Sequence, residues 1–287
     1  MSELKIGGCI SFQKSNLKQV IEDTLHIGGN AVMFYVGGPS SGFKPKLNKK
    51  LISEGLEFAK ENNISVDNMV IHGNYISNFA SPEEEKREMA MGLLRKEIDL
   101  AMEIGIKWLV IHPGSYTTGN LKDGIQHVAN CLNHVLKETD NVVLCLETMA
   151  GKGKEIGRDF MELQCIIEKI ELQNKIGVCV DTCHINDAGY DIQNHIDDVI
   201  RELDGLIGLD KVHIIHLNNS MNQINSKKDR HSNIYDGTIN PEVLYNLTRH
   251  PQLQNKIWIL ESKNTSLFSQ EVQFFKQSKY NRKALNE

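Results

Sequence analysis

Short apolar runs alternate with amphipathic stretches along the whole chain. Eight runs rich in valine, isoleucine and leucine predict buried strands, and between them apolar residues recur every three or four positions, which predicts helices with one buried face. The predicted strands are Leu4–Ser11, Ala31–Val36, Asn68–His72, Trp108–His112, Asn141–Glu147, Ile176–Asp181, Val212–His216 and Ile257–Glu261. This alternation predicts an α/β fold with one domain over residues 1–287, a single (β/α)8 TIM barrel. An open doubly wound sheet is the alternative, but it does not need eight repeats.

Composition narrows the function only a little. The net charge of −5 does not by itself indicate a nucleic-acid binder, although it leaves room for a local basic surface. The six cysteines include no C-x-x-C pair, which argues against a zinc ribbon or a thioredoxin-like site. Because the chain has neither an apolar signal region at its start nor a run as long as a membrane span, we expect a cytoplasmic protein without a membrane partner.

Six of the predicted strands end in a histidine or a carboxylate: His72, His112, Glu147, Asp181, His216 and Glu261. In a parallel barrel these strand ends converge on the C-terminal face, where active sites are built. Counting back by two from each gives residues that could fill the barrel, namely Val70, Val110, Cys145, Cys179, Ile214 and Ile259. The polar residues should therefore cap the core and point toward one another.

A metal centre explains this convergence better than core packing does. Three clustered carboxylates would repel one another unless a cation lay between them. Mixed imidazole and carboxylate ligands suit zinc, with Mn²⁺ or Fe²⁺ as alternatives at some sites. Six ligands predict two ions, with Glu147 or Asp181 near both. His184, after strand six, and Asp229 and His231, in the loop after strand seven, predict a separate third set, for which a solvated polar loop is the alternative.

Seven stretches around these residues carry a resemblance to a known family. They are His72-Gly-Asn-Tyr75, Ile111-His-Pro-Gly-Ser115, Leu146-Glu-Thr-Met-Ala-Gly151, Val180-Asp-Thr-Cys-His184, Ile215-His-Leu-Asn218, Asp229-Arg-His231 and Leu260-Glu261. In this order they resemble the endonuclease IV family of apurinic/apyrimidinic (AP) endonucleases. The resemblance implies three zinc ions: His72, His112 and Glu147 hold the first; Glu147, Asp181, His216 and Glu261 the second; His184, Asp229 and His231 the third.

The resemblance also implies the reaction and the substrate. Family members are DNA repair hydrolases that act on double-stranded DNA, cleave the phosphodiester 5′ to an abasic site, and leave a 3′-hydroxyl and a 5′-deoxyribose phosphate. By this resemblance Glu261 and Glu147 are catalytic as well as metal ligands, and the protein is expected to be a monomer. Tyr75 matches the family's inserting tyrosine, although a tyrosine packed under its own loop is the alternative.

Further DNA contacts are predicted at Arg230, Phe43 and Lys44. The loop from Gly37 to Lys44 lacks the arginine that family members use to penetrate the base stack, so Phe43 or Lys44 is expected to take its place.

Two other functions compete with this hypothesis. Related barrels include metal-dependent sugar isomerases and epimerases, which use one or two ions and would leave the third set of ligands spare. A DNA-lesion binding protein with structural zinc is the other alternative, but structural zinc sites favour thiolates over carboxylates. The number of bound ions distinguishes the nuclease, with three, from the isomerase, with one or two.

Overall fold

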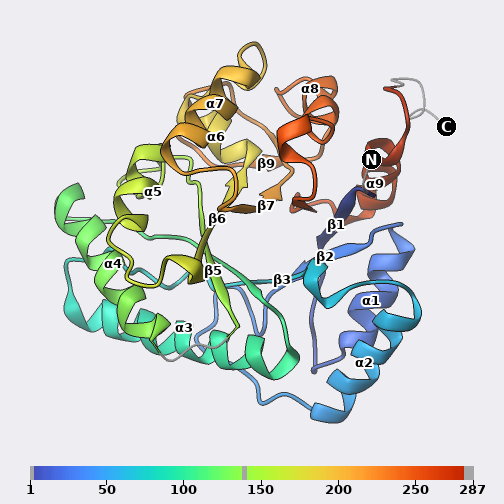
Figure 1. The fold of residues 1–287 in the computed structure, drawn as a ribbon, viewed down its shortest axis with the longest axis horizontal. Helices are drawn as coiled ribbons and strands as arrows, with labels where there is room; N and C mark the ends of the chain where they lie inside the picture. Colours follow the sequence, from blue (N-terminus) through green and yellow to red (C-terminus); the bar gives the residue numbers. More distant parts are fainter. Residues whose placement is uncertain (1–2, 138–140, 281–287) are drawn as a thin grey trace.

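Eight parallel strands close into a barrel at the centre of the molecule (Figure 1). The computed structural model describes residues 3–137 and 141–280. The barrel strands, in their order around the barrel, are β1 (Lys5–Cys9), β2 (Ala31–Phe34), β3 (Met69–His72), β4 (Trp108–Ile111), β5 (Val143–Glu147), β6 (Ile176–Asp181), β7 (Val212–His216) and β10 (Ile257–Leu260). The predicted barrel is confirmed.

Helices lie around the barrel and cover its outer surface (Figure 1). They are α1 (Leu17–His26), α2 (Lys49–Glu61), α3 (Glu84–Ile104), α4 (Leu121–Leu136), α5 (Phe160–Ile167), α6 (Thr182–Ala188), α7 (Ile196–Leu206), α8 (Pro241–Leu247) and α9 (Phe268–Lys276). Short 3-10 turns are η1 (Val66–Asn68), η2 (Gln173–Lys175), η3 (Pro251–Leu253) and η4 (Thr265–Leu267), and β8 (Asn219–Ser220) pairs with β9 (His231–Ser232). None of the helices in the described ranges combines the length and hydropathy that a membrane span requires.

Two apolar layers hold the fold together. The larger one packs the helices against the outside of the barrel. The smaller one fills the barrel and consists of Ala31, Met33, Val70, Val110, Val143, Cys145, Cys179, Ile214, Ile257 and Ile259. It contains all six residues that strand parity predicts, so that prediction is confirmed. Because inward and outward side chains alternate along a strand, the residue two places beyond each inward residue must point at the barrel mouth.

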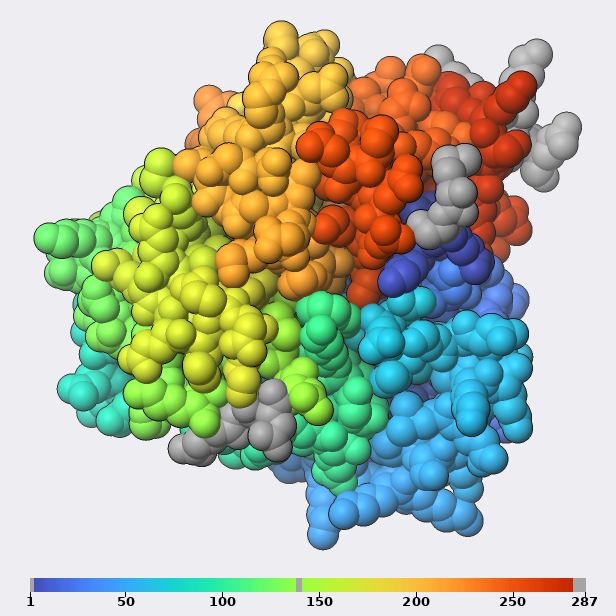
Figure 2. All heavy atoms as spheres, viewed as in Figure 1, coloured from blue at the N-terminus to red at the C-terminus, as the bar shows by residue number. Residues whose placement is uncertain are grey.

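The barrel closes where β1 meets β2 and β10, so the first and the last strand of the barrel lie side by side. Gly7 of β1 makes this closure geometrically allowed, since a Cβ there would lie 1.6 Å from the carbonyl oxygen of Ala31. The space-filling view shows the first segments, in dark blue, against the last ones, in red (Figure 2). Closure leaves the barrel sheet without an exposed edge.

The start of α3 differs from what the sequence predicts. Ser81 followed by proline and glutamate predicts a helix whose cap is Ser81, but α3 begins at Glu84. The Ser81 hydroxyl instead accepts a hydrogen bond from the Glu83 amide at 3.1 Å, and the Arg87 guanidinium binds the Ser81 carbonyl at 2.8 Å. The serine thus closes a turn just before the helix.

Candidate metal centre

The nine side chains predicted as metal ligands lie together at the C-terminal end of the barrel strands. His72, Glu147, Asp181 and His216 end β3, β5, β6 and β7; His112 and Glu261 directly follow β4 and β10; His184 lies in α6, Asp229 precedes β9 and His231 begins it. A cavity of about 440 Å³ opens over them and is lined by six of the nine, His112, Glu147, His184, Asp229, His231 and Glu261, and by Tyr75 and Arg230.

Glu147 lies between two groups of potential ligands. One oxygen, Oε2, is 3.1 Å from Nε2 of His72 and 3.1 Å from Nε2 of His112. The other, Oε1, is 3.0 Å from Nδ1 of His216. Both oxygens of this buried carboxylate therefore face imidazoles on opposite sides, which is the arrangement that a bridging ligand requires.

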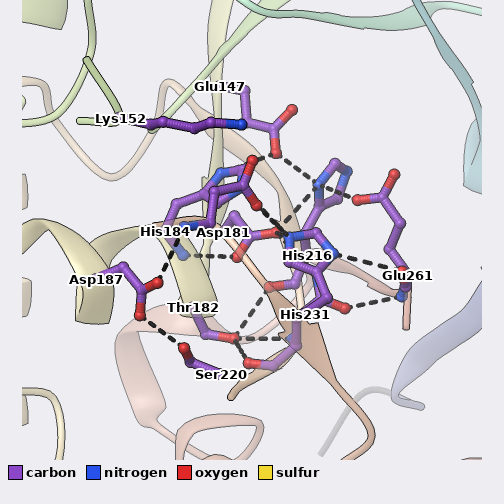
Figure 3. Close-up of polar contacts among 12 residues, drawn as sticks. Glu147, Lys152, Asp181, Thr182, His184, Asp187, His216, Ser220, His231 and Glu261 are labelled. Carbon is purple, nitrogen blue, oxygen red and sulfur yellow. Dashed lines mark hydrogen bonds and ion pairs between the residues drawn. The ribbon is translucent and has the colours of Figure 1, made fainter. Parts of the chain in front are cut away.

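The second and third groups share the same compact geometry (Figure 3). Nδ1 of His216 lies 3.2 Å from Glu261 Oε2 and 3.7 Å from Asp181 Oδ2. In the third group, Nε2 of His184 lies 3.0 Å from Asp229 Oδ1 and 3.3 Å from Nε2 of His231. Within each group the ligand atoms all lie within 4.8 Å of one another. These three of the four groups of potential ligands have the membership that the resemblance implies, and the fourth consists of Asp181, Cys183 and His231.

The donor chemistry of these groups fits divalent metal ions. Cys183 also lies near Asp181 and His231, but burial and the carboxylates of Asp181 and Asp187 raise the pKa of its thiol. Without this cysteine each of the three groups still has three or four ligands, so none of them needs it. What remains is imidazole nitrogen and carboxylate oxygen, a combination that zinc accepts readily.

Hydrogen bonds on the far side of the imidazoles fix which nitrogen faces the site. Nδ1 of His72 lies 2.7 Å from the Gly73 carbonyl oxygen, and Nδ1 of His184 lies 2.7 Å from the Thr148 carbonyl oxygen. A carbonyl can only accept, so both Nδ1 atoms carry hydrogen and both Nε2 atoms are free to bind an ion.

Buried carboxylates and imidazoles of the cluster shift one another's pKa values. Burial alone would raise the pKa of Glu147, but His216 and His112 outweigh it and hold that pKa well below its usual range. Burial alone would lower the pKa of His216, yet Cys179, Glu147 and Glu261 raise it well above the usual value. The cluster therefore requires positive charge, and bound metal ions would replace these protons.

Asp181 has two functions at once. Its Oδ1 accepts a hydrogen bond from the His184 amide at 2.9 Å and so caps α6, while its Oδ2 faces the second group. The sequence predicts His184 in a loop, whereas the structure places it in the first turn of α6, directly after β6. Oδ2 also accepts a hydrogen bond from the Asn218 side chain at 2.7 Å, and the Asn218 oxygen accepts one from the Glu261 amide at 2.8 Å.

The segment that carries Asp229 is held by a second buried carboxylate, Asp187. One of its oxygens accepts a hydrogen bond from the Ser220 hydroxyl at 2.6 Å (Figure 3). The other accepts hydrogen bonds from the Asn222 side-chain amide at 3.1 Å and from the Asp229 backbone amide at 3.1 Å. Asp229 has a φ of +54°, a conformation that non-glycine residues seldom adopt without support. Asp187 supplies that support, because it binds the backbone nitrogen of this very residue.

Tyr35 is a site residue that the sequence reasoning missed. Its hydroxyl donates to Oε1 of Glu261 at 3.0 Å and lies 2.5 Å from the Tyr75 hydroxyl. Burial and the Glu261 carboxylate raise the Tyr35 pKa, so the phenol keeps its proton. The sequence holds a signal for it: counting forward by two from the inward residues Ala31 and Met33 reaches Tyr35, directly after β2.

The predicted DNA contacts fall in different environments. Phe43 and Tyr75 are 72% and 49% exposed, and Arg230 is exposed at the cavity. Lys44 corrects the prediction made for it: its side chain is only 4% exposed, and Nζ lies 2.5 Å from Oε1 of the buried Glu97. A buried carboxylate needs a compensating cation, so Lys44 turns inward and does not present its charge to a ligand.

Comparisons with known proteins agree with this geometry. Residues 21–278 match the family described as xylose isomerase-like TIM barrel. A probable endonuclease 4 of Clostridium beijerinckii is 41% identical over 261 residues, which cover 91% of this chain and 93% of the relative. The solved endonuclease IV of Thermus thermophilus is 26% identical with a TM-score of 0.82, covering 94% and 97% of the two chains. A solved D-tagatose 3-epimerase-like protein is 19% identical with a TM-score of 0.65 over 94% and 96%, which shows a shared fold alone. By its matched residues and its identity to these relatives, the chain belongs to the endonuclease IV family of xylose isomerase-like TIM barrels.

Proposed function

We propose that this protein is a DNA repair endonuclease that hydrolyses the phosphodiester 5′ to an abasic site in double-stranded DNA and leaves a 3′-hydroxyl and a 5′-deoxyribose phosphate. The observation that carries the proposal is the third group, His184, Asp229 and His231, beside two groups that share Glu147. A sugar isomerase of the same fold has no use for a third ion. Membership in the endonuclease IV family supports the same reaction.

The three groups would each hold one zinc ion. His72, His112 and Glu147 would hold the first, Glu147 with Asp181, His216 and Glu261 the second, and His184 with Asp229 and His231 the third. Bound zinc supplies Lewis-acid chemistry: it neutralises charge on phosphate oxygens and makes a water acidic enough to give hydroxide near neutral pH.

Glu261 is the residue best placed to orient the attacking water. Its Oε2 lies 3.2 Å from His216, and its Oε1 accepts a hydrogen bond from the Tyr35 hydroxyl. Although burial would raise the pKa of Glu261, His216 and other histidines lower it, so the side chain is a carboxylate at neutral pH. A carboxylate fixed in this way can accept a hydrogen bond from water and hold its lone pair toward the phosphorus.

The rim of the cavity has the chemistry to bind a damaged duplex. Lys152, Arg230 and Lys263 line the cavity and would contact phosphates. Tyr75 exposes its ring at this cavity and Phe43 exposes its ring on the loop after β2, and both would fill the space left by the missing base. Moving an abasic nucleotide out of the helix costs less than moving a paired one, since stacking and pairing are already lost there.

Incision of a defined substrate tests the proposal. A duplex with one tetrahydrofuran abasic analogue and a labelled 5′ end would be incubated with the purified protein, and zinc per chain would be measured on the same sample. We expect one nick 5′ to the analogue and about three zinc ions per chain. Binding without nicking would support a lesion-binding protein. One or two ions, with epimerisation of a ketose and no nick, would support the isomerase alternative.

A single substitution tests the third group. His231→Ala should remove one zinc ion per chain and most of the incision activity, because this group would keep only His184 and Asp229. His195→Ala is the matched control, since its side chain, at the residue just before α7, is 65% exposed. Retention of all three ions in His231→Ala would contradict the assignment of this group.

A further inference from the structure

A buried ion pair outside the metal groups joins the loop after β2 to helix α3. Lys44 belongs to the loop after β2, and Glu97 belongs to α3. The Lys44 ammonium lies 2.5 Å from Glu97 Oε1, with side-chain exposures of 4% and 2%. Buried ion pairs contribute little net stability, because desolvation of two charges offsets their attraction, whereas they can specify one arrangement of the chain. A contribution to stability therefore does not explain why this pair is buried, whereas a role in fixing the arrangement of the chain would.

The same carboxylate oxygen also holds the loop after β3. Glu97 Oε1 accepts hydrogen bonds from the Asn74 backbone amide at 3.0 Å and from its side-chain amide at 2.9 Å. The Asn74 oxygen in turn accepts from the Ile76 amide at 3.1 Å and the Ser77 amide at 3.0 Å. One carboxylate therefore fixes a lysine of one loop and the turn of the next, and removal of either partner would loosen both.

The residues next to these anchors are exposed and apolar. Phe43 precedes Lys44, while Tyr75 and Ile76 follow Asn74, and the three are 72%, 49% and 38% exposed. The two loops also touch directly, since the Tyr75 amide donates to the Pro39 carbonyl at 2.8 Å. Exposed apolar side chains on short loops normally move among rotamers, and ordering them on binding weakens affinity.

We propose that Lys44, Glu97 and Asn74 form a latch that holds Phe43, Tyr75 and Ile76 in place before DNA arrives. The three exposed side chains then act as one rigid wedge that fits a gap in a base stack. Lys44 and Glu97 are positioning residues in this scheme, because they touch the loops and not the DNA. The inference rests on the proposed function, since the wedge needs a duplex that lacks a base.

Steady-state incision by variants of the full-length zinc-loaded protein tests the latch. Lys44→Met removes the cation and keeps the length of the side chain, and Lys46→Met removes an exposed charge from the same loop as a matched control. We expect Lys44→Met to raise KM for the abasic duplex about tenfold, since the wedge must then be ordered on binding. We expect kcat at saturating DNA, zinc per chain and affinity for an intact duplex to stay within about twofold, and Lys46→Met to match wild type at moderate salt.

A second variant shows whether the pair acts as a unit. Glu97→Gln keeps an oxygen for Asn74 but removes the charge that holds Lys44, so it should also raise KM. If the latch is one unit, the double variant Lys44→Met/Glu97→Gln should be no worse than the more affected single variant. Multiplying effects would overturn the latch, as would an unchanged KM in Lys44→Met. A fall in kcat and in zinc content as large as the rise in KM would also overturn it, because the pair would then only stabilise the fold in general. Failure of the wild-type protein to nick the duplex would instead overturn the proposed function.

Discussion

Asn218 tests whether hydrogen bonds from residues outside the metal groups hold the ligands of these groups in position. Its side chain donates to Asp181 Oδ2 at 2.7 Å and accepts from the Glu261 amide at 2.8 Å, so it joins two ligands of the second group that come from β6 and β10. Alanine would remove a hydrogen bond to a carboxylate, worth about 1.5–3 kcal/mol, and one to a backbone amide, worth about 0.5–1.5 kcal/mol. Because Asn218 is 1% exposed, little water can replace these bonds.

Only part of this energy should appear as lost metal affinity. Removing a residue that orients a metal-binding side chain typically weakens the binding of the metal ion about 10–100-fold, or about 1.4–2.8 kcal/mol. Zinc titration of the metal-free Asn218→Ala protein against a chromophoric chelator should therefore show one ion weakened by that factor and the others close to wild type. Asn130→Ala, which alters an exposed asparagine on α4, is the control. If all ions bound Asn218→Ala within about twofold of wild type, the inferred support of Asp181 and Glu261 would be wrong.

Three other changes probe the site and the fold. Tyr35→Phe removes the hydroxyl that donates to Glu261 and should lower kcat about tenfold at unchanged zinc content, measured by single-turnover incision and metal analysis. Glu261→Gln should abolish incision while abasic-duplex binding, followed by fluorescence anisotropy, persists; normal turnover would remove Glu261 from the mechanism. Burial raises the pKa of Glu271 to about 7, so the folded protein holds a proton that the unfolded chain releases above about 4.5, and stability falls as pH rises between these values. Glu271→Gln should abolish this slope and gain up to about 3 kcal/mol at pH 8 in urea unfolding, and an unchanged slope would contradict the raised pKa.

The strand ends could be predicted because two independent patterns agree there. An apolar run fixes the strand, and parity within the strand fixes which of its side chains point inward. Val70 and His72, or Cys179 and Asp181, therefore have to lie on the same face once the run is identified. The same rule applied to β2 leads to Tyr35, which was missed because a tyrosine after an apolar run also looks like ordinary packing.

Contacts between distant segments could not be predicted in this way. Lys44 and Glu97 are 53 positions apart, and nothing in either local pattern distinguishes a buried partner from a solvated charge. A lysine beside an exposed loop phenylalanine suggests a DNA contact, and the correction follows only from the position of α3 beneath that loop. Asp181 shows a further limit: one of its oxygens caps α6 and the other faces the second group, and the local sequence does not reveal that one side chain does both.

The segment between β7 and α8 shows why the fold alone leaves the chemistry undecided. Barrels of this kind support many reactions, and they differ in the loops at the C-terminal ends of their strands. Here residues 217–240 form a small hairpin, β8 and β9, that carries Asp229 and His231 back over the mouth. Asp187 anchors its loop from α6, and Asn219 binds the carbonyls of Ile234 and Ile239 at 2.8 Å and 2.7 Å. Buried polar groups destabilise a fold unless each has a hydrogen-bond partner, and here the partners hold the third group in place. The proposed third ion would therefore depend on this loop more than on the barrel beneath it.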